Sequence, residues 1–145
     1  FDGYLHDPAR TEKVIDQDGW IYTGDLAERD RDGLVFIKGR ADNMFISGGE
    51  NISPEEIEQA LAKHPAIAGA ICAGIPDPKW GQAPVALVVF HAGESATEEE
   101  LKAFCRDYLA DYKVPKQIWS VAELPLTGAG KLNRNAVVTH YAGGA

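Results

Sequence analysis

The sequence predicts a small α+β domain, with a three-stranded sheet, flanking helices and a hairpin. Two apolar runs, near residues 67–75 and 84–91, are rich in Ala, Ile and Val, as buried strands are. Two segments, 53–64 and 97–112, combine helix-start residues with apolar residues at helical spacing. The segment "KQIWSVAEL" adds a third strand after the second helix. From residue 44 the expected order is therefore hairpin, helix, strand, strand, helix, strand, loop and helix, without repeats, which is a small α+β domain.

Residues 19–40 predict two further strands, joined by the turn signal "DRDG", whereas residues 1–18 are polar without a clear period. A short hairpin is expected next, with Gly48 and Gly49 between its strands, because paired glycines permit positive φ. Residues 41–43 lie between these two parts and are the best candidate for a domain boundary.

Both helices of the C-terminal part have strong start signals. Ser53 is placed to cap the first helix, Pro54 suits its first position, and Glu56 would complete a capping box. Thr97 and Glu100 repeat the capping-box spacing at the second helix. A Pro/Gly loop, "PDPKWGQA", is expected between the two long strands, and a short helix near 134–141 ends the domain.

Composition restricts the function classes. The chain has 145 residues, of which 45% are hydrophobic and 25% charged, an ordinary globular balance. The net charge of −8 argues against a general binder of nucleic acid or anionic membranes. No apolar run approaches the ~20 residues of a membrane span and no signal peptide is visible, so we expect a cytoplasmic protein. Cys72 and Cys105 are expected to be reduced core residues, and the scattered histidines predict no metal site.

The segment "LPLTGAGKLNR", residues 124–134, places Lys131 after a run of small residues. A Walker A loop needs a glycine five residues before the Gly-Lys pair and Ser or Thr after the lysine. Pro125 and Leu132 occupy those positions, so this interpretation fails. Taken alone, the residues favour a solvated lysine on a turn.

Four other features could bind a ligand, although each also has a plainer structural interpretation. Asp25 ends the run "YTGD" with a carboxylate that could accept from a pair of hydroxyls. Arg40 and Asp42 lie two apart at the boundary, as a surface pair would. Gly48 begins a stretch of bare backbone just before a helix start. The Pro/Gly loop carries an aromatic residue, which could pack locally or hold a ligand.

The order and spacing of four motifs is more specific than any one of them. "GWIYTGDLAERDRDGLVFIKGRADNMFISGGENISPEEIE" followed by "PLTGAGKLNR" resembles the adenylate-forming superfamily of acyl-CoA synthetases, peptide-synthetase adenylation domains and luciferases. "SGGENISPEEIE" with "PDPKWGQ" is most similar to fatty-acyl-, aryl- and coumarate-type CoA ligases. The resemblance implies that residues 1–41 are the tail of a large AMP-binding domain. It implies that residues 42–145 are the small C-terminal lid domain, with a hinge near 42.

The resemblance also implies a two-step ligase reaction, in which an acid attacks the α-phosphate of ATP and CoA thiol then attacks the acyl-adenylate. Lys131 would stabilise the charge that develops during adenylation. Asp25 would bind the ribose hydroxyls, Arg40 the ribose or phosphate, and Asp42 would be the hinge residue. The implied CoA-binding residues are Gly48, Gly49, Trp80, Tyr112, Lys113 and Lys116. Val114 occupies a position where some relatives have an arginine.

The implied co-substrates are ATP with Mg²⁺, bound mainly by an N-terminal domain, together with CoA and a carboxylic acid. We therefore expect this chain to be inactive alone and to work with its own N-terminal domain. Two alternatives stay open. One is an adenylation domain that loads a carrier protein. The other is a noncatalytic fragment that binds a partner or forms a homodimer through apolar surface on residues 1–40.

Overall fold

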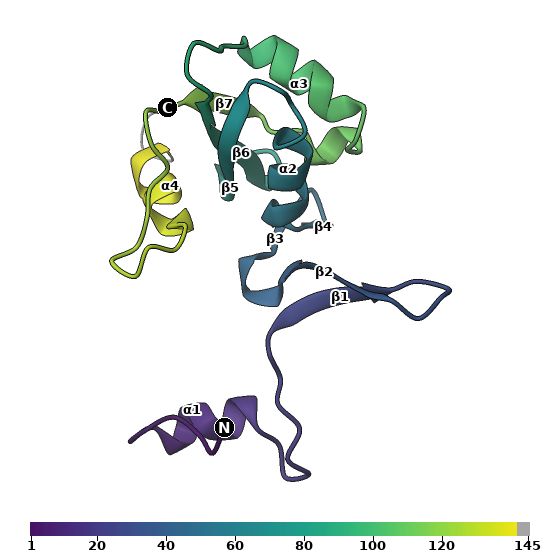
Figure 1. The fold of residues 1–145 in the computed structure, drawn as a ribbon, viewed down its shortest axis with the longest axis vertical. Coiled ribbons are helices and arrows are strands. Elements are labelled where there is room, and N and C mark those ends of the chain that lie inside the picture. The colour runs from purple at the N-terminus through teal and green to yellow at the C-terminus, as the bar shows by residue number, and fades with distance from the viewer. Residues whose placement is uncertain (142–145) are drawn as a thin grey trace. The chain divides into compact units, whose positions relative to one another are not determined.

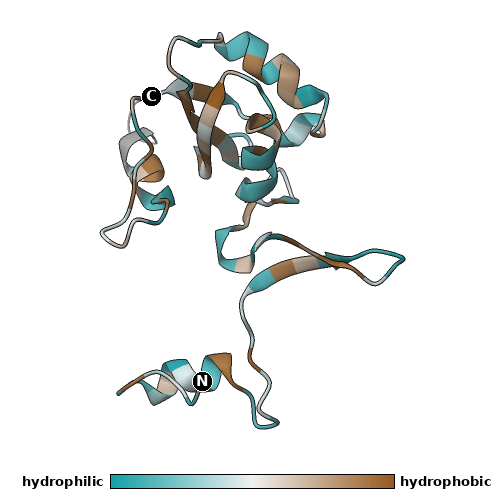
Figure 2. Cartoon of the chain, in the orientation of Figure 1, coloured by the Kyte–Doolittle hydropathy of each residue, from teal (hydrophilic) through white to brown (hydrophobic). Residues whose placement is uncertain are grey.

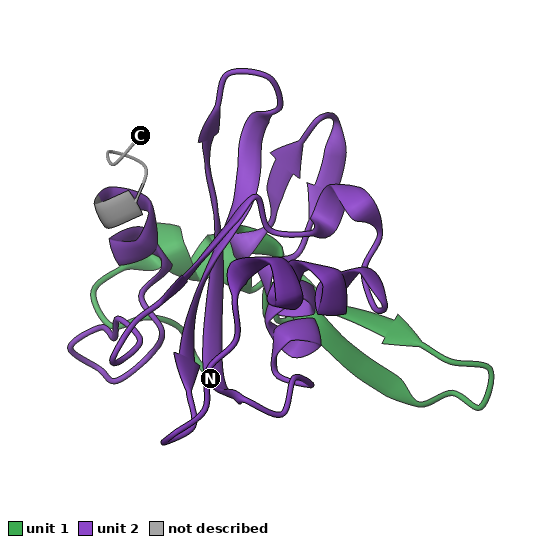
Figure 3. Ribbon diagram, turned by 90° about the horizontal axis from the view of Figure 1, so that it is seen from above, with its two compact units in different colours: residues 1–42 green, residues 43–145 purple. Residues whose placement is uncertain are grey.

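The computed structural model describes residues 1–141 and divides into two compact units, residues 1–42 and residues 43–145 (Figure 3). The first unit is a helix followed by a two-stranded ribbon, and the second contains the three-stranded sheet with its helices (Figure 1). Over residues 1–141, no helix is long and apolar enough to cross a membrane. The sheet and helices confirm the predicted α+β class.

The first unit contains a helix that the sequence analysis did not predict. The helix α1 (Pro8–Val14) begins where the Asp7 carboxylate accepts from the Arg10 backbone N–H, with proline in the first turn. The expected strands form as β1 (Asp25–Arg29) and β2 (Val35–Arg40), which pair antiparallel. The first strand is shorter than expected, because residues 19–24 contribute only an isolated bridge between Ile15 and Ile21.

A 3₁₀ turn, η1 (Ala41–Asn43), leads into the predicted hairpin of β3 (Phe45–Ser47) and β4 (Glu50–Ile52). Gly48 has φ 58° and Gly49 has φ 89°, so both central residues are left-handed, as a type I′ hairpin turn requires. Both glycines therefore adopt the positive φ values that the sequence led us to expect.

The two helices with predicted capping boxes begin differently, although their start signals are alike. At α3 (Glu98–Arg106) the capping box is complete, with Thr97 and Glu100 exchanging side-chain to backbone hydrogen bonds. At α2 (Pro54–Leu61) it does not form. The Ser53 hydroxyl donates to Glu55 Oε2 at 2.9 Å instead of accepting from the helix backbone. The Glu56 carboxylate accepts from Lys113, at 2.7 and 2.9 Å.

The main sheet has the order β5–β6–β7, formed by β5 (Ile67–Asp77), β6 (Gly81–Phe90) and β7 (Gln117–Ser120). The first pair is antiparallel and the second is parallel, so α3 serves as the crossover that a parallel pair needs. Only residues 78–80 separate β5 from β6, so the Pro/Gly connection is much shorter than the sequence suggested. A 3₁₀ turn, η2 (Asp111–Lys113), precedes β7, and α4 (Arg134–Tyr141) follows the glycine-lysine loop as predicted.

Both faces of this sheet are covered, which explains the nearly continuous apolar runs of β5 and β6 (Figure 2). On one face α2 and α3 pack on Cys72, Ala86 and Val88. On the other face α4 contributes Val137 to a cluster with Ile71 and Leu87. Cys72 and the equally buried Cys105 of α3 are free thiols, and burial raises the pKa of both.

Candidate functional site

The first unit brings together three of the predicted site residues. Asp25 and Arg40 are direct partners in the β1–β2 ladder. The Arg40 guanidinium donates to Asp25 Oδ1 at 3.1 Å and to the Thr23 carbonyl at 2.8 Å, and it lies 3.6 Å from Asp42 Oδ2. All three side chains are at least about one third exposed to solvent. Arg40 therefore holds the Asp25 carboxylate in place while leaving it accessible to a ligand hydroxyl.

In the second unit, Gly48 and Trp80 form one contact. The Gly48 N–H donates to the Trp80 carbonyl at 2.9 Å, and the indole covers the glycine. A Cβ on Gly48 would lie 2.7 Å from Trp80 Cε3, so the indole can occupy this position only because residue 48 is glycine. Trp80 is still 48% exposed, which leaves the rest of its surface available.

The Asp77 carboxylate fixes the turn that carries Trp80. It accepts from the backbone N–H groups of Lys79 and Trp80, both at 2.9 Å, and from the Lys116 ammonium. The bond from Lys116, followed by those two backbone bonds, lowers the pKa of Asp77. Lys116 thus joins β7's N-terminal end to the tryptophan turn.

A cleft of about 450 Å³ lies beside this turn. Four of the six predicted CoA-binding residues line it: Gly48, Trp80, Tyr112 and Lys116. Gly49 is not among its lining residues, and neither is Lys113, whose ammonium is engaged by Glu56 on α2. The structure therefore gathers most of the predicted set and gives Lys113 a bracing position instead.

The cleft also contains two cations that the sequence analysis missed, Lys102 and Arg106, both on α3. Lys102 is bound to Glu98 at 2.7 Å and to the Lys116 carbonyl. Arg106 is 56% exposed, and among the described side chains its one ion pair, with Asp111, is 3.8 Å long, so its guanidinium is the more available of the two. No motif marks these positions, because only the packing of α3 beside η2 brings them to the cleft.

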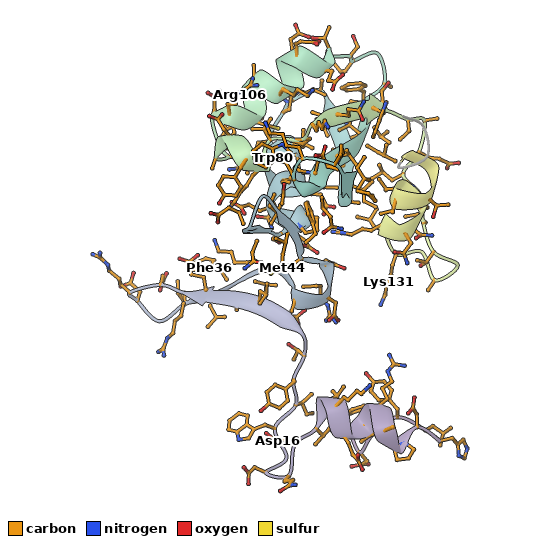
Figure 4. The ribbon with its side chains drawn as sticks, turned by 180° about the vertical axis from the view of Figure 1, so that it is seen from behind. Asp16, Phe36, Met44, Trp80, Arg106 and Lys131 are labelled. Carbon is orange, nitrogen blue, oxygen red and sulfur yellow. The ribbon has the colours of Figure 1, made fainter. Side chains whose placement is uncertain are left out.

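Lys131 lies away from the cleft, on the other side of the second unit (Figure 4). Its backbone is held in a tight turn: Thr127 N–H donates to the Lys131 carbonyl at 2.7 Å, and Gly130 N–H donates to the Thr127 carbonyl at 2.8 Å. A bridge between Leu126 and Leu132 closes the base of the turn. Among the side chains of residues 1–139, none forms an ion pair or hydrogen bond with the Lys131 ammonium, so its charge is available to a ligand.

The fold and these surfaces define a class: a small α+β domain with a cationic, aromatic cleft at one place and a glycine-lysine turn at another. Comparison with known proteins gives the family. Residues 56–131 match the AMP-binding enzyme C-terminal domain, and the chain belongs to this family.

Several proteins with assigned names are similar to this chain. A 2-succinylbenzoate–CoA ligase from Geobacillus sp. (strain WCH70) is 48% identical over 92% of this chain and 27% of its own length. The o-succinylbenzoate CoA synthetase of Bacillus subtilis, solved with its acyl-adenylate intermediate, matches with a TM-score of 0.85. It is 38% identical over 93% of this chain and 27% of its own.

An amide bond synthetase from Marinactinospora thermotolerans matches with a TM-score of 0.88 and 36% identity, over 96% of this chain and 28% of its own. The chain therefore spans little more than a quarter of the length of the relatives it matches.

Proposed function

We propose that this chain is the C-terminal portion of an ATP-dependent acid–CoA ligase. In the first step a carboxylate oxygen of the acid bonds to the α-phosphorus of ATP and pyrophosphate leaves. In the second step the CoA sulfur bonds to the acyl carbon, AMP leaves, and the thiol proton passes to solvent or a base. Residues 43–145 would serve the two steps with different surfaces.

The observation that carries this proposal is the cleft around Trp80. It combines a bare glycine turn, an aromatic ring and three cations, and four of its residues are among those to which the family resemblance assigns CoA binding. A pantetheine chain needs a narrow apolar passage, and the phosphates of CoA need cations. The separate position of Lys131 fits a domain that presents one surface for adenylation and the other for thioester formation.

Lys131 would act in the first step. Negative charge concentrates on the α-phosphate and the attacking carboxylate as the new bond forms, and a positioned ammonium stabilises it. Asp25 and Arg40 would bind the ribose and the adjacent phosphate. Asp42 would be the hinge about which the second unit turns. The triphosphate, Mg²⁺ and the acid would be bound mainly by an N-terminal domain of the same protein.

The test separates the two half-reactions in the full-length ligase. Lys131→Ala should reduce adenylation, measured by ATP–pyrophosphate exchange, by about a hundred- to a thousandfold. Thioester formation from preformed acyl-adenylate should stay within about threefold of the wild type, because that step uses the cleft. Lys63→Ala is the matched control, since it removes a charge from the same unit outside both surfaces. Equal losses in both half-reactions would contradict the role given to Lys131.

The exposed apolar residues of the ribbon support a large N-terminal partner domain. Val35, Phe36 and Ile37 are between 50% and 63% exposed, and Trp20 and Tyr22 are more exposed still. A two-stranded ribbon with so much apolar surface is at best marginally stable in water alone. In the proposed ligase this surface would be covered by the N-terminal domain, whose last strands the ribbon would continue.

A further inference from the structure

Arg134 links the glycine-lysine turn to α2 through two carboxylates. It is the first residue of α4 and follows Lys131 by three positions. Its Nη2 atom donates to Glu55 Oε1 at 3.1 Å and to Glu58 Oε2 at 2.9 Å. All three side chains are less than 20% exposed, so this ion cluster is largely removed from water.

Glu55 has a second bond that leads toward the proposed hinge. Its Oε1 atom also accepts from the Asn43 side-chain amide, and its Oε2 atom accepts from Ser53 Oγ at 2.9 Å. Asn43 is the first residue of the second unit and follows Asp42 directly. One carboxylate oxygen therefore binds both the residue that begins this unit and the residue that ends the lysine loop.

The packing around the lysine loop leaves space on both sides of the turn. A hollow of about 350 Å³ lies beside the segment that leads to the turn, residues 121–126, and is lined by Leu87, Val121, Leu124 and Leu126 among others. A second cleft, of about 240 Å³, lies between Asn43 and the residues that follow Lys131. Space is thus left beside both the segment before the turn and the segment after it, whereas Arg134 gives the second segment a directed, charge-assisted attachment to α2.

From this geometry we infer that Asn43, Glu55 and Arg134 form a tie that positions Lys131 relative to the hinge. The inference rests on the proposed function, because it assigns these residues a role in adenylation. If the second unit turns about Asp42, the tie would keep the base of the lysine loop at a fixed position relative to Asn43. Neither Asn43 nor Arg134 needs to touch the substrate, so both are positioning residues.

The tie is expected to affect one half-reaction. A displacement of a reacting group by about 1 Å can cost about a hundredfold in rate. In the full-length ligase, Arg134→Gln should therefore lower the kcat of adenylation by about ten- to a hundredfold, with the KM for ATP within about threefold of wild type. Thioester formation from preformed acyl-adenylate should change less than about threefold. Arg134→Lys should recover part of the loss, because the ammonium keeps the charge without the planar guanidinium.

Asn43→Ala and Glu55→Gln test the same tie without removing the arginine, so the inference can be judged even if Arg134→Gln does not fold. Asn43→Ala should reduce adenylation in the same direction, and Asn43→Ala combined with Arg134→Gln should cost less than the product of the two single losses. Arg31→Ala, in the exposed turn between β1 and β2, is the control for loss of an arginine charge.

The outcomes separate this inference from the proposed function. If Lys131→Ala abolishes adenylation but Asn43→Ala and Arg134→Gln do not lower it, the tie is wrong and the proposed function stands. If the tie variants lower both half-reactions equally, their role is structural and the inference is overturned. If Lys131→Ala itself leaves adenylation intact, the proposed function fails first.

Discussion

Glu58, on α2 in the second unit, has a carboxylate whose pKa is strongly raised on folding. Its carboxylate is 13% exposed and accepts from the Cys72 backbone N–H at 2.7 Å as well as from Arg134. Desolvation outweighs these favourable bonds and raises the pKa of Glu58 to about 7, from an ordinary value of 4.5. The nearby Glu55 carboxylate adds to the increase. The ion cluster therefore contains a group that changes charge near neutral pH.

This pKa predicts how stability depends on pH. Because the folded chain holds the Glu58 proton more tightly than the unfolded chain, the free energy of unfolding should fall as pH rises from about 4.5 to about 7. The full effect is at most about 3 kcal/mol. Glu58→Gln keeps the acceptor for Cys72 without the charge, so it should remove this decline. Urea unfolding of both chains at pH 5 and pH 8 measures it.

Glu99→Gln, on the exposed side of α3, is the control for that measurement and should follow the wild type. A Glu58→Gln chain that loses as much stability as the wild type over this pH range would show that Glu58 titrates normally.

Gly128 allows the proposed role of the turn to be tested without disturbing the fold. A Cβ at Gly128 would meet nothing within 4 Å, and its φ is not in the left-handed region, whereas Gly130 has φ 75°. The fold therefore needs glycine at 130 but not at 128. If the turn approaches a nucleotide, Gly128→Val should leave the thermal midpoint within about 2 °C and still lower adenylation at least tenfold. A melting curve and pyrophosphate exchange measure the two effects, and normal adenylation would contradict a close approach.

At the scale of elements, the sequence predicted what local patterns determine. The helix over α3, the type of residue in the β3–β4 turn and the buried strands β5 and β6 depend on caps, glycines and apolar runs that lie within each segment. The failures have other causes. The Ser53–Glu56 box does not form, since the Ser53 hydroxyl donates to Glu55 Oε2 instead of accepting from the helix backbone, and the Glu56 carboxylate accepts from Lys113, far along the chain. The helix α1 was missed although Asp7 and Pro8 are ordinary start signals, because its seven residues bury nothing and show no apolar period.

The candidate site follows the same rule. Residues within recognisable motifs, such as Trp80 and Lys131, could be assigned from the sequence as expectations. Arg106 could not, because it reaches the cleft only through the tertiary placement of α3, and no local motif marks it. Arg134 lies within the motif "PLTGAGKLNR", yet its proposed role depends on Glu55 and Glu58, which a single sequence does not connect to it.

The end of α3 makes a testable contribution to the cleft. Arg106 is a partly exposed cation that lines the same cleft as Lys116, where Val114 supplies no charge. Arg106→Ala in the full-length ligase should raise the KM for CoA about five- to tenfold, as expected for one charge-assisted bond to a phosphate. The adenylation rate should not change, because in the proposed function that step uses the Lys131 surface. Steady-state kinetics with varied CoA measures this, and an unchanged KM would exclude Arg106 from CoA binding.

At the scale of the whole molecule, the two units differ in how much of their apolar surface is buried. The second unit covers both faces of its sheet, whereas the ribbon of the first leaves Val35, Phe36 and Ile37 exposed. This difference follows from the proposal that the ribbon continues a larger domain. It predicts two properties of the chain by itself: it should give no ATP–pyrophosphate exchange, and it should self-associate through the uncovered ribbon.

Sedimentation velocity over a range of concentrations tests the second property. The wild-type chain should shift toward dimers or larger species as concentration rises, because association removes apolar surface from water. Phe36→Lys should keep the chain monomeric by placing a charge within that surface, whereas Lys79→Ala, in the other unit, should associate like the wild type. A wild-type chain that stays monomeric at every concentration would contradict an uncovered adhesive surface. Clear pyrophosphate exchange by the chain alone would contradict the need for an N-terminal domain, because the residues that bind the triphosphate would then have to lie within these 145 positions.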